Sequence, residues 1–218
     1  MTGKMKETKL LIIRHGQSIG NLERRFLGHT DLDLSELGYK QAEIVAEYLK
    51  NEKIDAVYSS DLKRAYNTVK PIAESRALKI KTSKNLREIY AGEWENGDYE
   101  YLSQNFCDEY EKWKTDIGNA YCNGGESVLE LQKRVYEEIL KIALENTGKT
   151  VCIGTHATPI RTLCAKIRGV KKDDMYKIPW ATNASVTTVL YSDGELKMVK
   201  YAEDEFMGEN ITRFSKGI

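Results

Sequence analysis

The sequence predicts an α/β protein, a three-layer α/β/α sandwich with a mostly parallel sheet, an antiparallel edge strand and a small helical cap insert. Short apolar runs of strand length alternate with longer segments of helical periodicity. Residues 185–191 and 196–201 are strand-like and are separated by Ser-Asp-Gly-Glu, which indicates a hairpin. With 218 residues the chain is long enough to bury a sizeable core. We expect one domain over residues 1–218, with residues 90–125 as its cap insert.

The expected strands of the parallel part are short and apolar. Leu10–Ile13 is predicted to be a buried strand that ends at Arg14-His15-Gly16, and Thr150–Thr155 has the same character. Two shorter strands are expected over residues 56–60 and 80–82. These four strands would build the sheet to which the hairpin adds an antiparallel edge.

Helices are expected between these strands. Over residues 35–50, Leu37, Ile44, Val45, Tyr48 and Leu49 fall largely on one face. Pro71 predicts a kink in one helix, and Pro159 suits the first turn of another. The expected helices span residues 35–50, 61–77, 99–117, 126–145 and 159–167. Residues 86–98 between them are expected to form a loop that ends at Asn96-Gly97.

Composition excludes several classes of protein. Lys and Arg total 33 and Asp and Glu total 33, so the net charge is zero, whereas a generic nucleic-acid binder is strongly basic. The apolar run at Leu10–Ile13 is too short for a signal peptide or a membrane span. The four cysteines form no Cys-x-x-Cys pair, and the histidines have no zinc-binding spacing. We therefore expect a cytoplasmic protein with reduced thiols and no nucleic-acid or membrane partner; the oligomeric state stays open.

Chemically active side chains follow the predicted strands at the points where those strands end. The segments concerned are Arg14-His15-Gly16, Ser60 to Arg64, Arg87-Glu88 and His156. In such a fold, ligands bind beyond the carboxyl ends of the strands. Arginine binds phosphate oxygens bidentately and stays charged, and a neutral imidazole is a nucleophile that forms covalent intermediates. These residues predict a phosphate site.

Five motifs, in order along nearly the whole chain, resemble those of the histidine phosphatase superfamily, which includes the cofactor-dependent phosphoglycerate mutases. They are Arg14-His15-Gly16-Gln17-Ser18 with Asn21, Arg25 to Asp31, Ser60 to Ala65, Leu86 to Ile89 with Gly92 to Glu95, and Gly154-Thr155-His156 with Ile160-Arg161. The resemblance implies catalysis through a phosphohistidine, a small phosphorylated substrate, and neither a metal nor a cofactor.

The resemblance also assigns roles to individual positions. His15 would be the phosphorylated nucleophile and Glu88 the proton donor. The catalytic residues would be His15, Glu88, His156, Arg14 and Arg64, and the substrate-binding residues Gln17, Asn21, Gly28 and Ala157. The family usually has glycine where Ala157 stands, so we expect a narrower pocket floor or an altered specificity.

Phosphatases and mutases of the family differ in the motif that contains Glu88. Mutases of the family carry Asn-Glu-Arg there, whereas this chain has Arg87-Glu88-Ile89 and a shorter insert after it. We therefore expect a metal-independent phosphatase acting on small organic phosphate monoesters. A cofactor-dependent phosphoglycerate mutase is the alternative. A non-catalytic phosphate sensor is a more distant one, which the presence of His15, Glu88 and His156 disfavours.

The cap insert is both acidic and aromatic. Between residues 95 and 123 it carries Glu95, Asp98, Glu100, Asp108, Glu109, Glu111 and Asp116, with Tyr99, Tyr101, Phe106, Tyr110, Trp113 and Tyr121. The simplest interpretation is a solvated acidic helix face. A sharper hypothesis is a lid that disfavours polyanions and favours monophosphates with an apolar, aromatic or cationic leaving group. His29, Trp180 and Asn183 are open between a place at the site and a structural role.

Overall fold

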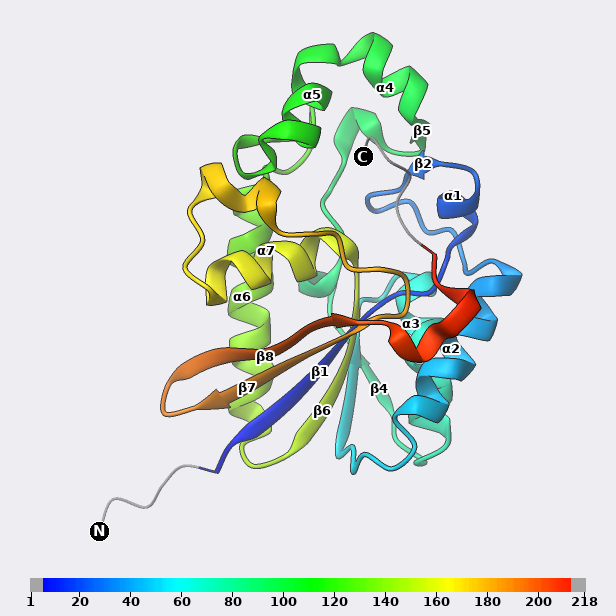
Figure 1. The fold of residues 1–218 in the computed structure, drawn as a ribbon, viewed down its shortest axis with the longest axis vertical. Helices are drawn as coiled ribbons and strands as arrows, with labels where there is room; N and C mark the ends of the chain where they lie inside the picture. The colour runs from blue at the N-terminus through cyan, green and yellow to red at the C-terminus, as the bar shows by residue number, and fades with distance from the viewer. Residues whose placement is uncertain (1–5, 213–218) are drawn as a thin grey trace.

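The computed structural model describes residues 6–212, which contain one six-stranded sheet in the order β4-β3-β6-β1-β7-β8 (Figure 1). The strands are β1 Thr8–Arg14, β3 Ala56–Ser59, β4 Ile80–Thr82, β6 Thr150–Thr155, β7 Val186–Ser192 and β8 Glu195–Glu203. β4, β3, β6 and β1 are parallel, and β7 and β8 continue the sheet antiparallel. The predicted α/β class, with a mostly parallel sheet and an antiparallel edge, is confirmed.

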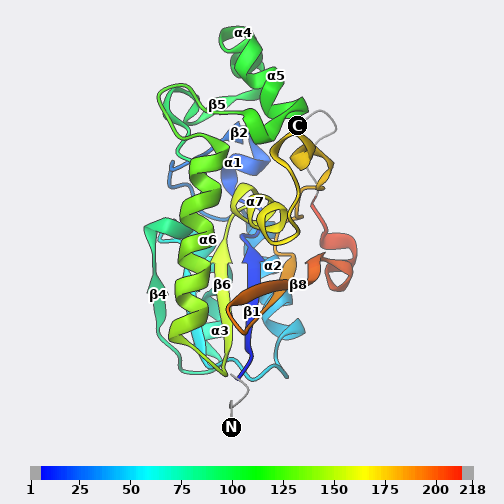
Figure 2. The same ribbon diagram turned by 90° about the vertical axis from the view of Figure 1, so that its left-hand side faces the viewer.

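Helices cover both faces of the sheet. They are α2 Glu36–Tyr48 and α3 Lys63–Glu74 on one face, and α6 Val128–Glu145 and α7 Ala157–Ile167 on the other (Figures 1 and 2). Leu10 and Ile12 pack in the core cluster that contains α6 and α7, whereas Leu11 and Ile13 pack in the cluster with α2 and α3. Because successive strand side chains point to opposite faces, the continuous apolar run in β1 fits a strand covered on both sides.

Local sequence explains where the helices begin. Ser35 caps α2 by accepting a hydrogen bond from the Gly38 N–H, and Ser127 and Glu130 form a capping box at α6. Pro71 lies inside α3, which continues to Glu74. The apolar face of residues 35–50 is not buried throughout, because Tyr48 is 43% exposed and stacks on Phe206.

The cap insert contains more and shorter elements than its sequence predicts. Residues 99–117, expected to be a helix or a helical insert, form a helical insert of two helices, because Phe106 leaves helical geometry between α4 Tyr99–Asn105 and α5 Cys107–Thr115. The expected loop 86–98 contains β5 Gly97–Asp98, which pairs with β2 Arg25–Phe26. A short helix, α1 Ile19–Leu22, was also not predicted. Figure 1 shows α4 and α5 beyond the carboxyl ends of the parallel strands.

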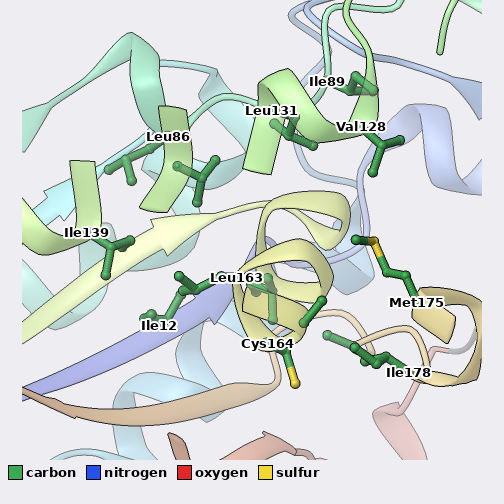
Figure 3. Close-up of a cluster of buried hydrophobic side chains, with 14 of the residues drawn as sticks. Ile12, Leu86, Ile89, Val128, Leu131, Ile139, Leu163, Cys164, Met175 and Ile178 are labelled. Carbon is green, nitrogen blue, oxygen red and sulfur yellow. The ribbon is translucent and has the colours of Figure 1, made fainter. Parts of the chain in front are cut away.

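The core on the α6 side holds the segment that carries Glu88. Leu86 and Ile89 are fully buried on either side of Glu88, in the same cluster as Ile12 of β1 and Leu131 of α6 (Figure 3). Two buried anchors so close in sequence restrict how far the intervening backbone moves.

The cysteines are free thiols, with Cys107 exposed and the others buried. Burial raises the pKa of the Cys152 thiol to about 12, so this side chain packs as a neutral group. Over residues 6–212 no group of His, Cys, Asp or Glu side chains is arranged to hold a metal ion. Within the same residues, no helix combines the length and apolar character needed to cross a bilayer.

Candidate active site

A cavity of about 530 Å³, counted with its open mouth, lies where β1 and β6 end. Its polar lining is formed by Arg14, His15, Asn21, Arg25, Arg64, Glu88 and Thr158. Its apolar lining is formed by Phe26, Leu27, Gly28, Tyr99, Trp113, Ala157 and Trp180.

His15 directly follows β1 and is almost fully buried. Its backbone N–H donates to the Thr155 carbonyl at 2.9 Å, which ties it to the end of β6. Its Nδ1 lies 2.7 Å from the Gly16 carbonyl oxygen; because a carbonyl only accepts, Nδ1 carries the hydrogen. Burial, then the charges of Arg64 and Arg14, hold the pKa of His15 well below its usual value. The ring is therefore neutral, with its lone pair on Nε2.

His156 lies beside His15 at the N-terminus of α7. The two ring centroids are 5.2 Å apart at an interplanar angle of 61°. His156 is fully buried, and its Nε2 lies 2.9 Å from the Ser60 Oγ. Burial, then the charge of Arg64, lowers the pKa of His156 well below its usual value. His156 is thus a second neutral imidazole, placed behind the cavity lining.

Arg14 and Arg64 are buried cations held by backbone carbonyls. Arg14 Nη1 donates to the Ala181 carbonyl at 2.6 Å. Arg64 donates from Nη1 to the Thr30 carbonyl at 2.7 Å and from Nη2 to the Gly28 carbonyl at 2.8 Å. Burial lowers the pKa of each guanidinium to about 10. Both remain charged at neutral pH, so the cavity floor is positively charged before any ligand arrives.

Glu88 faces the same cavity. Its carboxylate accepts from the Ile89 N–H at 2.8 Å and from the Thr158 N–H at 3.2 Å. Burial raises its pKa, although these hydrogen bonds oppose the shift. Its backbone carbonyl accepts from Arg134 Nη2 at 2.8 Å and from His29 Nε2 at 3.1 Å. A carboxyl group of raised pKa is suited to hold and release a proton near neutral pH.

Three of the four predicted substrate-binding residues line the cavity: Asn21, Gly28 and Ala157. Asn21 is oriented by Asn183, whose Nδ2 donates to the Asn21 Oδ1 at 3.2 Å. Gln17 is not among the residues that line the cavity. Its side-chain oxygen instead accepts from the Ser35 Oγ at 2.8 Å, which joins it to the start of α2.

Several residues at the site were not predicted. Thr158, Phe26 and Arg25 line the cavity, and Trp180, left open above, does so too. His29, also left open, holds the Glu88 backbone instead of lining the cavity. The strand-end rule selects residues that follow the strands of the main sheet, whereas the aromatic wall comes from the cap insert, from β2 and from the segment before β7.

The acidic side chains of the cap insert do not line the cavity; of that insert, Tyr99 and Trp113 do. Asp98 caps α4 by accepting from the Tyr101 N–H, and Glu100 is exposed. The acidic part of the lid hypothesis is therefore not supported by the geometry, whereas its aromatic part is. The cavity that these aromatic residues enclose carries cations on its floor.

Residues 10–204 match the family model described as the histidine phosphatase superfamily (branch 1). The chain belongs to the histidine phosphatase superfamily. It is 29% identical over 210 residues to phosphoserine phosphatase 1 of Hydrogenobacter thermophilus, covering 96% of this chain and 99% of that protein. It is 33% identical over 192 residues to phosphoglycerate mutase-like protein 4 of Arabidopsis thaliana, covering 86% and 81%.

Solved structures of this superfamily have the same fold. The structure of Bacillus stearothermophilus YhfR superposes with a TM-score of 0.88 at 26% identity, covering 92% of this chain and 99% of that one. The names of the similar proteins include both phosphatases and mutase-like proteins. Membership of the superfamily therefore identifies a histidine phosphatase-type enzyme, and the choice between the two reactions depends on this chain's own residues.

Proposed function

We propose that this protein is a metal-independent phosphatase that hydrolyses small organic phosphate monoesters through a phosphohistidine on His15. The observation that carries the proposal is the hydrogen bond from His15 Nδ1 to the Gly16 carbonyl, which leaves the lone pair on Nε2 of a neutral ring. That ring lines a cavity together with Arg14 and Arg64. A nucleophile beside two fixed cations suits attack on a phosphate.

In the first step His15 Nε2 forms a bond to phosphorus while the bond from phosphorus to the ester oxygen breaks. The leaving oxygen takes the proton that Glu88 holds, so an alcohol departs and Glu88 becomes a carboxylate. The raised pKa of Glu88 keeps the protonated form available for this transfer. Arg14 and Arg64 balance the charge on the remaining phosphoryl oxygens.

In the second step a water molecule attacks the phosphohistidine. Glu88 takes one proton from that water, the new bond from oxygen to phosphorus forms, and the bond from Nε2 to phosphorus breaks. Inorganic phosphate leaves, and both His15 and Glu88 return to their starting protonation states. The guanidinium groups supply in both steps the positive charge that other phosphoryl-transfer enzymes take from metal ions.

Ile89 favours the phosphatase over the mutase. At this position mutases of the family have an arginine, which binds substrate, whereas the Ile89 side chain is fully buried with Val128 and Leu131 (Figure 3). A buried isoleucine presents no charge to a second phosphate group. The similarity to a phosphoserine phosphatase over nearly the full length supports the same reaction.

The aromatic wall favours one class of leaving group. Phe26, Tyr99, Trp113 and Trp180 line the cavity, which favours an apolar or aromatic group on the ester oxygen. A cationic leaving group, part of the earlier hypothesis, is disfavoured because Arg25 also lines this cavity. Since the cap insert supplies two of the four aromatic side chains, we propose that it acts as the lid of a single catalytic domain.

The test is hydrolysis of p-nitrophenyl phosphate in the presence of EDTA by the wild type and by His15→Ala. We expect metal-independent turnover that His15→Ala abolishes, and covalent labelling from ³²P-phosphate ester that is lost in His15→Ala but retained in the matched variant His29→Ala. A mutase assay with 3-phosphoglycerate and 2,3-bisphosphoglycerate runs alongside. Cofactor-stimulated mutase activity without hydrolysis would establish the mutase instead, and a label that persists in His15→Ala would refute the nucleophile.

The leaving-group assignment has its own measurement. We expect kcat/KM for an aryl phosphate to exceed that for 2,3-bisphosphoglycerate, and Trp113→Leu to reduce the preference for the aryl ester. A clear preference for the bisphosphate would contradict the assignment and leave the phosphatase mechanism intact.

A further inference from the structure

Glu95 of the cap insert does not line the cavity. It nevertheless accepts hydrogen bonds from the loop of residues 28–31, whose backbone carbonyls hold Arg64. We propose that Glu95 is a positioning residue that fixes Arg64 in the phosphate pocket and so joins the cap insert to the catalytic centre. This inference rests on the proposed function, because it takes Arg64 to be a phosphate ligand.

The Glu95 carboxylate accepts four hydrogen bonds. Oε1 accepts from the His29 N–H at 2.7 Å and from the Ala91 N–H at 3.1 Å. Oε2 accepts from the Thr30 N–H at 2.8 Å and from the Thr30 Oγ at 2.6 Å. Three of these donors are backbone N–H groups, which only donate. The position therefore requires an acceptor at both oxygens, which a carboxylate supplies and an amide does not.

The carbonyls of the same loop hold Arg64. The Gly28 carbonyl accepts from Nη2 and the Thr30 carbonyl accepts from Nη1, at 2.8 and 2.7 Å. One residue further on, Asp31 Oδ1 accepts from the Lys63 N–H at 2.7 Å, at the start of α3. The loop thus donates its N–H groups to Glu95 and offers its carbonyls to Arg64. A shift of the loop would move both carbonyls and the guanidinium bound to them.

Gly28 shows how closely Glu95 fits against the loop. Its φ is +48°, and a Cβ on it would overlap the Glu95 Oε1 and lie 2.5 Å from the Ala91 Cβ. Only glycine adopts this conformation while leaving room for the carboxylate. Next to this contact the Asn96 N–H donates to the Phe26 carbonyl at 2.7 Å, where β5 meets β2. The segments around Gly28 and Glu95 are separate motifs in the sequence, but in the structure they pack directly against each other.

The charge of Glu95 favours the protonated form of Arg64, whereas its hydrogen bonds fix where Arg64 lies. Arg64 is fully buried, and burial lowers its pKa, while the negative charges of Glu88, Asp31 and Glu95 oppose that shift. Replacing Glu95 by an uncharged residue removes one of these charges and also weakens the hydrogen bonds that hold the loop. Arg64 stays charged at neutral pH, and the lost carboxylate charge no longer repels a phosphate dianion, so it is the release of the loop that weakens the binding of a phosphate dianion to Arg64.

The test measures the affinity for orthovanadate and for inorganic phosphate by calorimetry, with kcat and KM on p-nitrophenyl phosphate. Glu95→Gln keeps the size of the side chain but places an NH₂ group against N–H donors. We expect it to weaken anion affinity by about tenfold, and Thr30→Val, which removes one donor, by about threefold. Glu93→Gln is the matched control, because Glu93 is an exposed carboxylate two residues away, and its anion affinity should equal that of the wild type.

A double-mutant cycle separates positioning from a general loss of structure. If Glu95 acts through Arg64, Glu95→Gln weakens anion binding in the wild-type background and causes no further loss in Arg64→Ala. Additive losses, or a folded Glu95→Gln with wild-type affinity, would overturn the inference. If Glu95→Gln does not fold, an unchanged affinity in Thr30→Val overturns it. Wild-type anion affinity in Arg64→Ala would instead refute the phosphate pocket of the proposed function.

Discussion

Replacing Glu88 by Gln should separate the two halves of the proposed reaction. Glutamine neither gives a proton to a leaving oxygen nor takes one from water. An alkyl phosphate needs that proton in the first step, so its kcat/KM should fall by roughly 10²–10⁴-fold, the usual contribution of general acid catalysis. This loss corresponds to about 3–5 kcal/mol of transition-state stabilisation. p-Nitrophenyl phosphate releases a stable phenolate, so its kcat/KM should change little.

The second half of the reaction should then limit turnover of the aryl ester. With p-nitrophenyl phosphate, Glu88→Gln should release one equivalent of nitrophenolate in a rapid burst and then turn over slowly, because water attack lacks its base. Stopped-flow absorbance measures the burst, and quenching in alkali preserves the phosphohistidine for detection. The pH profile provides a second test. Since burial raises the Glu88 pKa, wild-type kcat/KM for an alkyl ester should decline as pH rises through that value, and Glu88→Gln should lack the decline.

The hydrogen bonds of the Glu88 carboxylate determine which controls this experiment needs. Each Glu88 oxygen accepts one backbone N–H, so glutamine leaves one of the two donors without an acceptor. That should cost about 1–3 kcal/mol of unfolding free energy, which a urea melt measures. Glu93→Gln, the exposed carboxylate nearby, should behave as the wild type on both esters. Equal losses on alkyl and aryl esters, or the absence of a burst, would refute the assignment of Glu88 as acid and base.

Three other predictions concern stability. Gly28→Ala should cost about 2–4 kcal/mol in urea melts, because φ is +48° and a Cβ would overlap Glu95; a loss below 1 kcal/mol would contradict this. Burial holds the pKa of His15 below that of the unfolded chain, about 6.5, so unfolded chains bind its proton more readily. Unfolding free energy should therefore fall as pH drops below that value, and less steeply in His15→Asn. Arg134→Met should cost about 2–4 kcal/mol and lower kcat, because Arg134 holds the Glu88 carbonyl; unchanged kcat would exclude that link.

The strand-end rule accounts for most of the catalytic centre. Arg14 ends β1 and His15 follows it, Arg64 lies near the start of the helix after β3, and His156 follows β6. Because parallel strands end at one edge of the sheet, residues far apart in sequence meet there without any further signal. Glu88 was predicted by the same rule, because it follows the strand at residues 80–82, which is β4.

What the sequence did not reveal depends on loops and not on strands. Ser60 contacts His156 across 96 positions, and Glu95 contacts the His29 N–H across 66. Periodicity reports which face of an element is buried, and gives no information on which backbone N–H a distant carboxylate reaches. β2 and β5 have two residues each, too few to show a strand period. Gln17 stands beside the nucleophile in sequence, yet it turns to Ser35.

The opposite pKa shifts of His15 and Glu88 are consistent with the two roles that we propose for them in one cavity. Burial beside Arg64 and Arg14 keeps the proton off His15, because a charged imidazole there would face two cations in a poorly solvated site. The same two cations attract a phosphate dianion, so the positive potential that keeps the proposed nucleophile neutral would also attract its substrate. Burial has the reverse effect on Glu88, where it favours the protonated form and outweighs the attraction of Arg64. Since environments that push two pKa values apart suit one group to be the nucleophile and the other the acid, the mechanism that we propose needs no metal ion to create either role.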